Sequence, residues 1–262
     1  MIRRYGLFIL VFLFLGACSS FSQDDTTLEK AEQEYARGNY FQARRLYEQY
    51  LEFEAQGKRR WEAWRRLLDI ALNVRRDQRK GALLLEAMCL EYMGQPERYS
   101  ALLWQLAGLY ADLQEWEKAA ETWQKVLALE GADGERAGEI YWNLGKVYQF
   151  QGQYSLAQEA MSGCMEKALD PKLRARCMYE LAQTFSLLKN QVQARMWLEK
   201  VRNLEDADAE LKALAVFLLA EIFEAEGKTA EARQLLESIL DTYPNPKAVE
   251  ARLKHLKAGR KR

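Results

Sequence analysis

Alanine recurs along this chain at nearly constant intervals, and this regularity constrains the fold more than any other feature. Successive intervals of 39, 37, 38, 37 and 38 residues separate Ala43, Ala82, Ala119, Ala157, Ala194 and Ala232. A sequence period of roughly 20 to 50 residues is typical of chains that stack one small structural unit repeatedly. We therefore expect an array of about six similar units, each containing one of these alanines.

Each unit has the pattern of two helices joined by a short turn. In the fourth unit, apolar or small residues at spacings of three and four form one stripe before Gly152 and a second stripe after it, as in paired amphipathic helices. The two stripes are Tyr141, Leu144, Gly145 and Tyr148, then Ala157, Met161 and Cys164. The second unit is degenerate, because Arg66, Asp69 and Asn73 stand at expected apolar positions and Asp77 replaces the turn glycine.

These residues resemble the tetratricopeptide repeat family, whose pattern is a large residue, then Leu-Gly, Tyr, Gly-x-Tyr, Ala and a closing Pro. The resemblance extends from about Leu28 to Tyr243. It implies an all-α fold, a right-handed superhelical solenoid of about six helix-turn-helix repeats. Val249, Leu253 and Leu256 then predict a C-terminal capping helix. Because the family's period is about 34 residues, the longer period here predicts about one additional helical turn per repeat.

The N-terminal segment predicts export and lipid attachment. Arg3 and Arg4 precede an apolar run that is shorter than the roughly 20 residues of a membrane-spanning helix, which favours a signal peptide. The run closes on Leu15-Gly16-Ala17-Cys18. This ending resembles a bacterial lipoprotein processing site, and the resemblance implies that the Cys18 thiol carries the lipid. A plain signal peptide or an uncleaved anchor is the alternative.

The same features give the expected organisation of the chain. We expect a signal peptide at 1–17, a lipidated cysteine and flexible tether at 18–27, a repeat solenoid with its cap at 28–258, and a basic tail at 259–262. Ser19 follows the cysteine and fits the outer-membrane sorting of well-studied lipoproteins. The expected location is therefore the outer membrane, with the solenoid facing the periplasm.

Two cysteines lie where consecutive helices should meet. Cys164 falls on the second helix of the fourth unit, and Cys177 begins the next first helix. Two interpretations are open. The thiols fill small core positions, or they form a disulfide, which would contribute about 2–4 kcal/mol and suits an oxidising compartment.

Basic residues gather in the degenerate second unit. Between Lys58 and Lys80 the chain has nine basic and three acidic residues. One hypothesis is a patch for an acidic partner or lipid headgroups, and the other is an ordinary solvated face. The candidate residues are Arg59, Arg60, Arg65 and Arg66.

Aromatic residues occupy one slot in four successive units. Intervals of 38, 37 and 38 residues separate Trp104, Trp142, Tyr179 and Phe217. The resemblance implies that this slot lines a concave groove where peptides bind, with polar contacts from Lys146, Gln149, Gln183 and Glu221. Rigid aromatics are frequent anchors of protein interfaces. The alternative is that the row packs as extra core between adjacent first helices.

Catalytic chemistry has little support in the sequence. The only histidine, His255, falls on the capping helix among lysines. No glycine-rich phosphate loop, nucleophile elbow or metal-ligand set is present, and the balanced charge gives no reason to expect nucleic acid. We expect no catalytic activity, cofactor or metal.

The sequence therefore predicts a scaffold that binds proteins in the bacterial envelope. The combination of features resembles the tetratricopeptide lipoproteins of outer-membrane protein assembly. Type IV pilus or secretin pilotins, and adaptors for peptidoglycan hydrolases, are alternatives that the sequence does not separate. A glycan-binding module, in which the aromatic row stacks on sugar rings, is a further alternative from another class.

Overall fold

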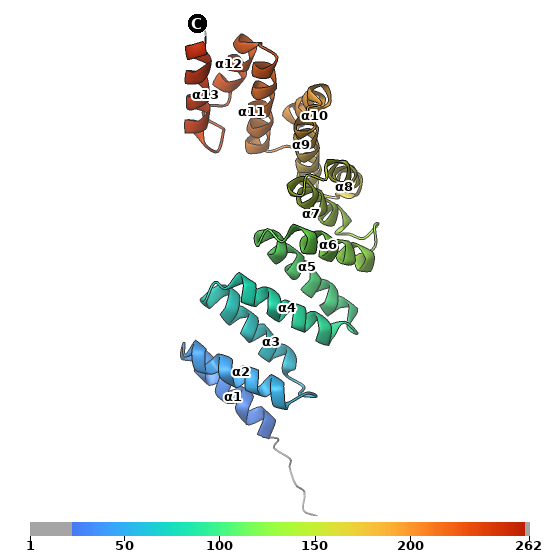
Figure 1. Cartoon of the computed structure of the whole chain (residues 1–262), viewed down its shortest axis with the longest axis vertical. Helices are drawn as coiled ribbons and strands as arrows, with labels where there is room; N and C mark the ends of the chain where they lie inside the picture. Colours follow the sequence, from blue (N-terminus) through green and yellow to red (C-terminus); the bar gives the residue numbers. More distant parts are fainter. Residues whose placement is uncertain (1–22, 260–262) are drawn as a thin grey trace, which may run out of the picture. The chain divides into compact units, whose positions relative to one another are not determined.

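The structure is a computed structural model that describes residues 23–259, so the predicted signal peptide at 1–17 and Cys18 lie outside the described residues. Within this range every regular element is helical: thirteen α-helices and one π-helical segment (Figure 1). The described residues form two compact units, which divide between Arg76 and Asp77. No described helix has the length and apolar character that crossing a bilayer requires.

The first unit contains α1 (Gln23–Ala36), α2 (Tyr40–Phe53), α3 (Arg60–Asp69) and the π-helical η1 (Ile70–Val74). Helix α1 begins inside the segment 18–27 that the sequence predicts to be a flexible tether. The core of this unit is apolar and mixes large residues with alanines. Its buried residues are Leu28, Ala31, Ala43, Tyr47, Tyr50, Ala63, Leu67, Ile70 and Ala71.

The second unit continues as consecutive helix pairs (Figure 1), and each of its helices contacts the next. The helices are α4 (Gln78–Tyr92), α5 (Pro96–Asp112), α6 (Trp116–Glu130), α7 (Ala137–Phe150), α8 (Tyr154–Lys167), α9 (Pro171–Leu187), α10 (Gln191–Asn203), α11 (Ala209–Ala225), α12 (Thr229–Glu237) and α13 (Pro246–Gly259). The predicted fold class is therefore confirmed as an all-α array of helix pairs.

Small residues allow neighbouring helices to approach closely. Ala119, Ala157, Ala194 and Ala232 have no solvent exposure, as their position in the middle of each second helix predicts. Gly145 has the same role on a first helix, because a Cβ atom there would lie 2.5 Å from the Cε atom of Met161. Such contacts hold helix axes near the short end of the usual range of about 8–10 Å.

The chain closes with the predicted capping helix. In α13 the side chains of Val249, Leu253 and Leu256 are buried against α11 and α12. Both α9 and α13 begin at a proline, where the missing N–H costs nothing. Asp170 precedes Pro171 and accepts a hydrogen bond from the backbone N–H of Lys172 at 3.0 Å, so it caps α9 as expected.

The second repeat has a different register from the one that the alanine spacing predicts. In the other five repeats the N–H of the recurring alanine donates to the carbonyl four residues earlier, as in Ala119 to Glu115 at 2.9 Å. In the second repeat Gly81 makes this bond, to Asp77 at 2.9 Å. The structural counterpart is therefore Gly81 and not Ala82, and the intervals become 38, 38, 38, 37 and 38 residues.

The turn and the π-helical segment explain this register. Arg76 has a positive φ of 54° and is therefore the turn residue of this repeat. The prediction that Asp77 takes the place of the turn glycine is wrong by one residue. In η1 the N–H of Arg75 donates to the carbonyl of Ile70 at 3.0 Å, an i→i+5 bond that takes up one residue more than an α-helical turn. The three polar residues at predicted apolar positions consequently lie outside the core: Arg66, Asp69 and Asn73.

The additional residues of each repeat are accommodated in two ways. Helices α9 and α11 have 17 residues each, which agrees with the prediction of longer helices. Before α7, however, residues 131–136 form a loop and not a helical turn. Gly131, with a φ of 83°, begins this loop directly after α6.

Candidate functional site

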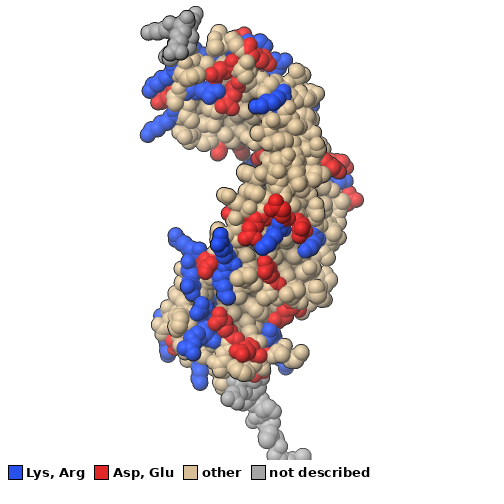
Figure 2. Space-filling view, in the orientation of Figure 1, with Lys and Arg blue, Asp and Glu red and all other residues tan. Residues whose placement is uncertain are grey.

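The predicted basic residues lie in the first unit, on α3 and the residue before it. Three of them, Arg59, Arg65 and Arg66, line a polar pocket of about 440 Å³ together with residues of α1. This pocket, which we call the α1–α3 pocket, contains as many carboxylates as guanidinium groups. Its lining residues are Glu32, Tyr35, Arg59, Glu62, Arg65, Arg66 and Asp69. On the face of the molecule in Figure 2, positive and negative side chains likewise lie side by side.

Ion pairs inside the pocket neutralise most of its positive charge. Arg66 donates two hydrogen bonds to Glu32, from Nη2 at 2.9 Å and from Nε at 3.1 Å. Its guanidinium also lies 4.2 Å from the ring centroid of Tyr35. Arg59 pairs with Glu62 at 2.7 Å. The contacts of Arg66 join α3 to α1, so this arginine links two consecutive first helices.

A second polar contact joins the same two helices. The Tyr35 hydroxyl donates to Asp69, and Asn73 donates to the same carboxylate at 2.7 Å. The bond from Tyr35, followed by that from Asn73, holds the pKa of Asp69 below its usual range, and the same contact raises the pKa of Tyr35. Asp69 is therefore an ionised acceptor that fastens α1 to α3.

The remaining two arginines differ in role. Arg60 donates from Nη1 to the carbonyls of Leu51 at 2.6 Å and Glu54 at 2.8 Å, at the C-terminal end of α2 where helical carbonyls lack partners. Arg65 is exposed on the pocket rim. Arg59, Arg60 and Arg66 thus have partners within the chain, and the predicted four-residue patch is a mixed-charge surface.

The aromatic row lies on the first helices α5, α7, α9 and α11, and all four side chains are partly buried. Trp104 packs edge-to-face on Trp123, with ring centroids 4.7 Å apart. The guanidinium of Arg136, from the loop before α7, lies 3.3 Å from the centroid of the Trp104 ring. Trp104 is therefore covered by a cation on one side and by its own repeat on another.

The other three aromatic residues also have close neighbours. The Nζ atom of Lys146 lies 4.6 Å from the Trp142 ring centroid, a cation–π arrangement. Tyr179 accepts a hydrogen bond from Gln183 at 2.9 Å. Phe217 stacks on Tyr243 with centroids 4.7 Å apart. Each ring of the row therefore packs against the chain and keeps part of its surface exposed.

Two of the four predicted polar residues bridge helices. Gln149 donates to the carbonyl of Glu180 at 2.9 Å and to the Thr184 hydroxyl at 2.7 Å, so it ties α7 to α9. Glu221 lies 3.7 Å from Arg252 on α13. Lys146 and Gln183 lie beside rings of the row. Among these contacts, those of Gln149 join two consecutive first helices that carry the row.

One acidic residue at this surface, Glu180, was not predicted from the sequence. Glu180 follows Tyr179 on α9, and burial raises the pKa of its carboxyl group, with Lys146 and Gln149 acting in the opposite direction. A partly buried acid with a shifted pKa beside an aromatic row marks a candidate functional position. In the sequence, the one signal for Glu180 is that it directly follows Tyr179 of the row. The helical register does not show that the Glu180 side chain is partly buried.

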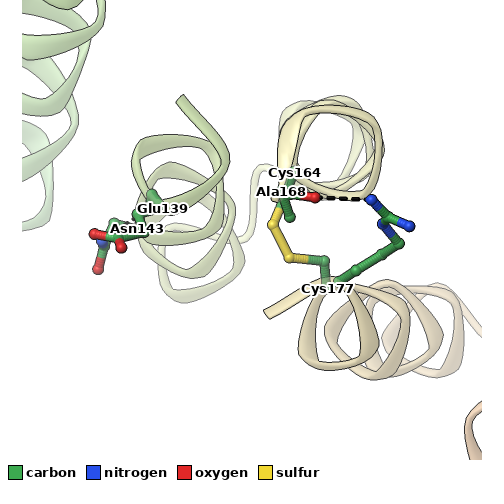
Figure 3. The surroundings of a disulfide bond; sticks show 6 residues. Glu139, Asn143, Cys164, Ala168 and Cys177 are labelled. Atoms are coloured by element: carbon green, nitrogen blue, oxygen red, sulfur yellow. Dashed lines mark hydrogen bonds between the residues drawn. A yellow bond between two sulfur atoms is a disulfide. The ribbon is translucent and has the colours of Figure 1, made fainter. Parts of the chain in front are cut away.

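A disulfide links Cys164 of α8 to Cys177 of α9, with their Cα atoms 6.0 Å apart (Figure 3). Both side chains are fully buried. Beside the bond, Arg174 donates to the carbonyl of Ala168 at 2.9 Å, the dashed contact in Figure 3. The structure thus corresponds to the disulfide interpretation of this pair. Cys89 is a buried free thiol whose pKa burial raises to about 11.

Comparison with protein families identifies the type of repeat in two segments of the chain. Two family models, both described as tetratricopeptide repeat, match residues 98–166 and 214–246. These segments are tetratricopeptide repeats. The first contains Trp104 and Trp142, and the second contains Phe217. No curated protein matches the chain by sequence.

Solved structures show a similar fold over most of this chain. BtubC from P. vanneervenii has a TM-score of 0.56 at 17% identity, over 86% of this chain and 95% of that one. PilF of Pseudomonas aeruginosa has a TM-score of 0.52 at 14% identity, over 87% and 97%. YrrB, described as a tetratricopeptide protein with an unusual peptide-binding site, has 0.52 at 16%, over 72% and 89%.

Proposed function

We propose that this tetratricopeptide array is a non-catalytic scaffold that binds a protein partner along the aromatic row. The observation that carries the proposal is the repetition of one partly exposed aromatic slot on four consecutive first helices, at Trp104, Trp142, Tyr179 and Phe217. Each ring already contacts a cation, an amide or another ring of the chain, so less side-chain entropy is lost when a partner covers it. The described residues contain no group of three or more side chains suited to a metal ion.

We further propose that the scaffold works in the bacterial envelope as an outer-membrane lipoprotein facing the periplasm, in the assembly of envelope complexes. The Leu15-Gly16-Ala17-Cys18 sequence supports this location. The buried disulfide between Cys164 and Cys177 supports an oxidising compartment, because such bonds are rare in the cytosol. Radiolabelled palmitate incorporation that depends on Cys18, followed by membrane fractionation, tests lipidation and location together.

A photoreactive residue at position 142 in living cells tests the binding surface. The matched control is the same residue at Gln158, on second helix α8 of the same repeat. A discrete protein trapped at 142 and absent at 158 supports the scaffold and shows whether the partner is a β-barrel assembly component, a pilus or secretin protein, or a peptidoglycan hydrolase. No trapped protein at 142, together with sedimentation of the chain with peptidoglycan, would replace the proposal by the glycan-binding alternative.

A further inference from the structure

Helix α4 is apolar on two opposite faces. One face is buried in the second unit through residues such as Leu85 and Met88. The opposite face exposes Leu83 at 58% and Leu90 at 72%. Together with the partly buried Ala87, these residues follow one another at spacings of four and three, so they form one stripe along the helix. We call Leu83, Ala87 and Leu90 the α4 stripe.

The α4 stripe is not a general feature of the second helices. Its outer positions lie two and nine residues after Gly81, the structural counterpart of the recurring alanine. Counted in the same way, α2 has Arg45 and Glu52, and α8 has Glu159 and Glu166, all of them exposed. At the first of these positions α6 likewise has the exposed Glu121, whereas α10 has the exposed apolar Met196. Among the second helices, α4 alone has leucine at both positions. A contiguous exposed apolar patch of this kind typically marks a contact surface.

The stripe is complementary to itself when two copies of α4 run antiparallel. In that arrangement Leu83 of one copy lies opposite Leu90 of the other, in both directions, and the small Ala87 lies near the centre where the helices approach most closely. A two-fold axis requires this kind of self-complementary surface. No residue of the stripe is charged, so pairing buries no ion.

Charge at the ends of α4 favours the same orientation. Arg79 and Lys80 are exposed at the N-terminal end of α4, and Glu91 is exposed in its last turn. An antiparallel pair places each basic end beside the acidic end of the other copy. It also places the basic side chains near the partial negative charge of the other helix's C-terminus. A parallel pair would place like charges together.

We infer that α4 is a self-association surface through which two copies of this chain pair in antiparallel orientation about Ala87. Stable dimers bury roughly 800 Å² on each partner, and the α4 stripe with Met93 at its edge provides only part of that area. The dimer is accordingly weak and dependent on concentration. The inference concerns a surface separate from the aromatic row and does not depend on the proposed function.

Cysteine crosslinking of the purified full chain over a range of concentrations tests this pairing. Ala87→Cys places a thiol beside the two-fold axis, and mild copper-catalysed oxidation should convert at least half of the protein to a species of twice the chain mass on a non-reducing gel. The control is Glu121→Cys, which occupies the slot of Leu83 on α6 and is also exposed. It should give at least fivefold less of that species.

A second variant separates specific pairing from random collision. Adding Leu83→Glu to Ala87→Cys places two carboxylates against the facing leucines and should reduce the crosslinked species at least fivefold. Circular dichroism of both variants checks that the helices remain folded. Equal crosslinking at positions 87 and 121 or no effect of Leu83→Glu would each overturn the inference.

Discussion

Gly138 of α7 lies directly against the backbone of Ala168: a Cβ atom at Gly138 would be 2.7 Å from the Cα atom and 2.9 Å from the nitrogen of Ala168. Ala168 ends α8 and is almost fully buried beside the disulfide. The missing side chain of Gly138 thus allows the α8–α9 connection to pack on the preceding first helix.

Gly138→Ala should therefore destabilise the protein although alanine is the better helix former. Backbone atoms cannot move aside as a flexible side chain can, so we expect a loss of about 1–3 kcal/mol in the free energy of unfolding. Gly108→Ala on α5 is the matched control, because nothing lies within 4 Å of the added Cβ atom. It should stabilise by roughly 0.5–1 kcal/mol. Urea unfolding followed by circular dichroism measures both, and equal effects would contradict the close contact.

Arg60 and Arg65 should respond differently to truncation. Arg60→Ala removes the donor to the carbonyls of Leu51 and Glu54, so we expect a loss of about 1–2 kcal/mol of stability. Arg65→Ala on the exposed rim should stay within about 0.5 kcal/mol of the original chain. Thermal unfolding of the two variants side by side checks this difference. A larger loss for Arg65 would mean that the pocket rim stabilises the first unit.

Glu180 should make stability depend on pH in an unusual direction. Burial raises the pKa of this carboxyl group above its ordinary value of 4.5, so the folded chain holds the proton more tightly than the unfolded chain. Stability from this group is present at low pH and is lost as pH rises through the folded pKa. Glu180→Gln should raise the melting temperature at pH 7, and this gain should vanish below about pH 4.

The control for this titration is Glu159→Gln, an exposed position on α8, which should leave the pH profile unchanged. Circular dichroism melts at several pH values measure both variants. A Glu180→Gln variant less stable than the original at pH 7 would show that the attraction of Lys146 outweighs the cost of burial.

The disulfide between Cys164 and Cys177 should contribute measurably to the free energy of unfolding. Closing a loop between cysteines 13 residues apart is expected to contribute about 3 kcal/mol, so Cys164→Ser with Cys177→Ser should lower the free energy of unfolding by about that amount. Thiol titration of the denatured, unreduced chain should find one thiol among the described residues, that of Cys89. Three thiols there would exclude the bond.

The sequence predicted the helix pairs well because their signal is local. A buried alanine with apolar residues three and four positions away determines both the helix and its inner face, as around Ala157. Glycine at the positive-φ turn position adds a second marker at Gly38, Gly152 and Gly227. Where Arg76 occupies that position and η1 adds a residue, both markers are absent. The pattern therefore selected Ala82, one residue from the true counterpart.

The candidate site was less predictable because its properties depend on contacts between repeats. The spacing located the row of Trp104 and its counterparts, but the cover supplied by Arg136 comes from a loop with no repeat pattern. In the α1–α3 pocket, the composition suggested a positive surface. The pair of Arg66 with Glu32 arises only when α3 faces α1. Together with the local pair of Arg59 with Glu62, it offsets most of that charge.

The link between Cys164 and Cys177 also has a mechanical consequence. Tension applied along the chain would pass from α8 to α9 through the sulfur atoms, because the covalent bond bypasses residues 165–176. That segment, which includes Ala168 and its contact with Gly138, would carry no load while the bond is intact. Under tension along the chain, the fourth and fifth repeats would therefore remain coupled after noncovalent junctions between other repeats had separated.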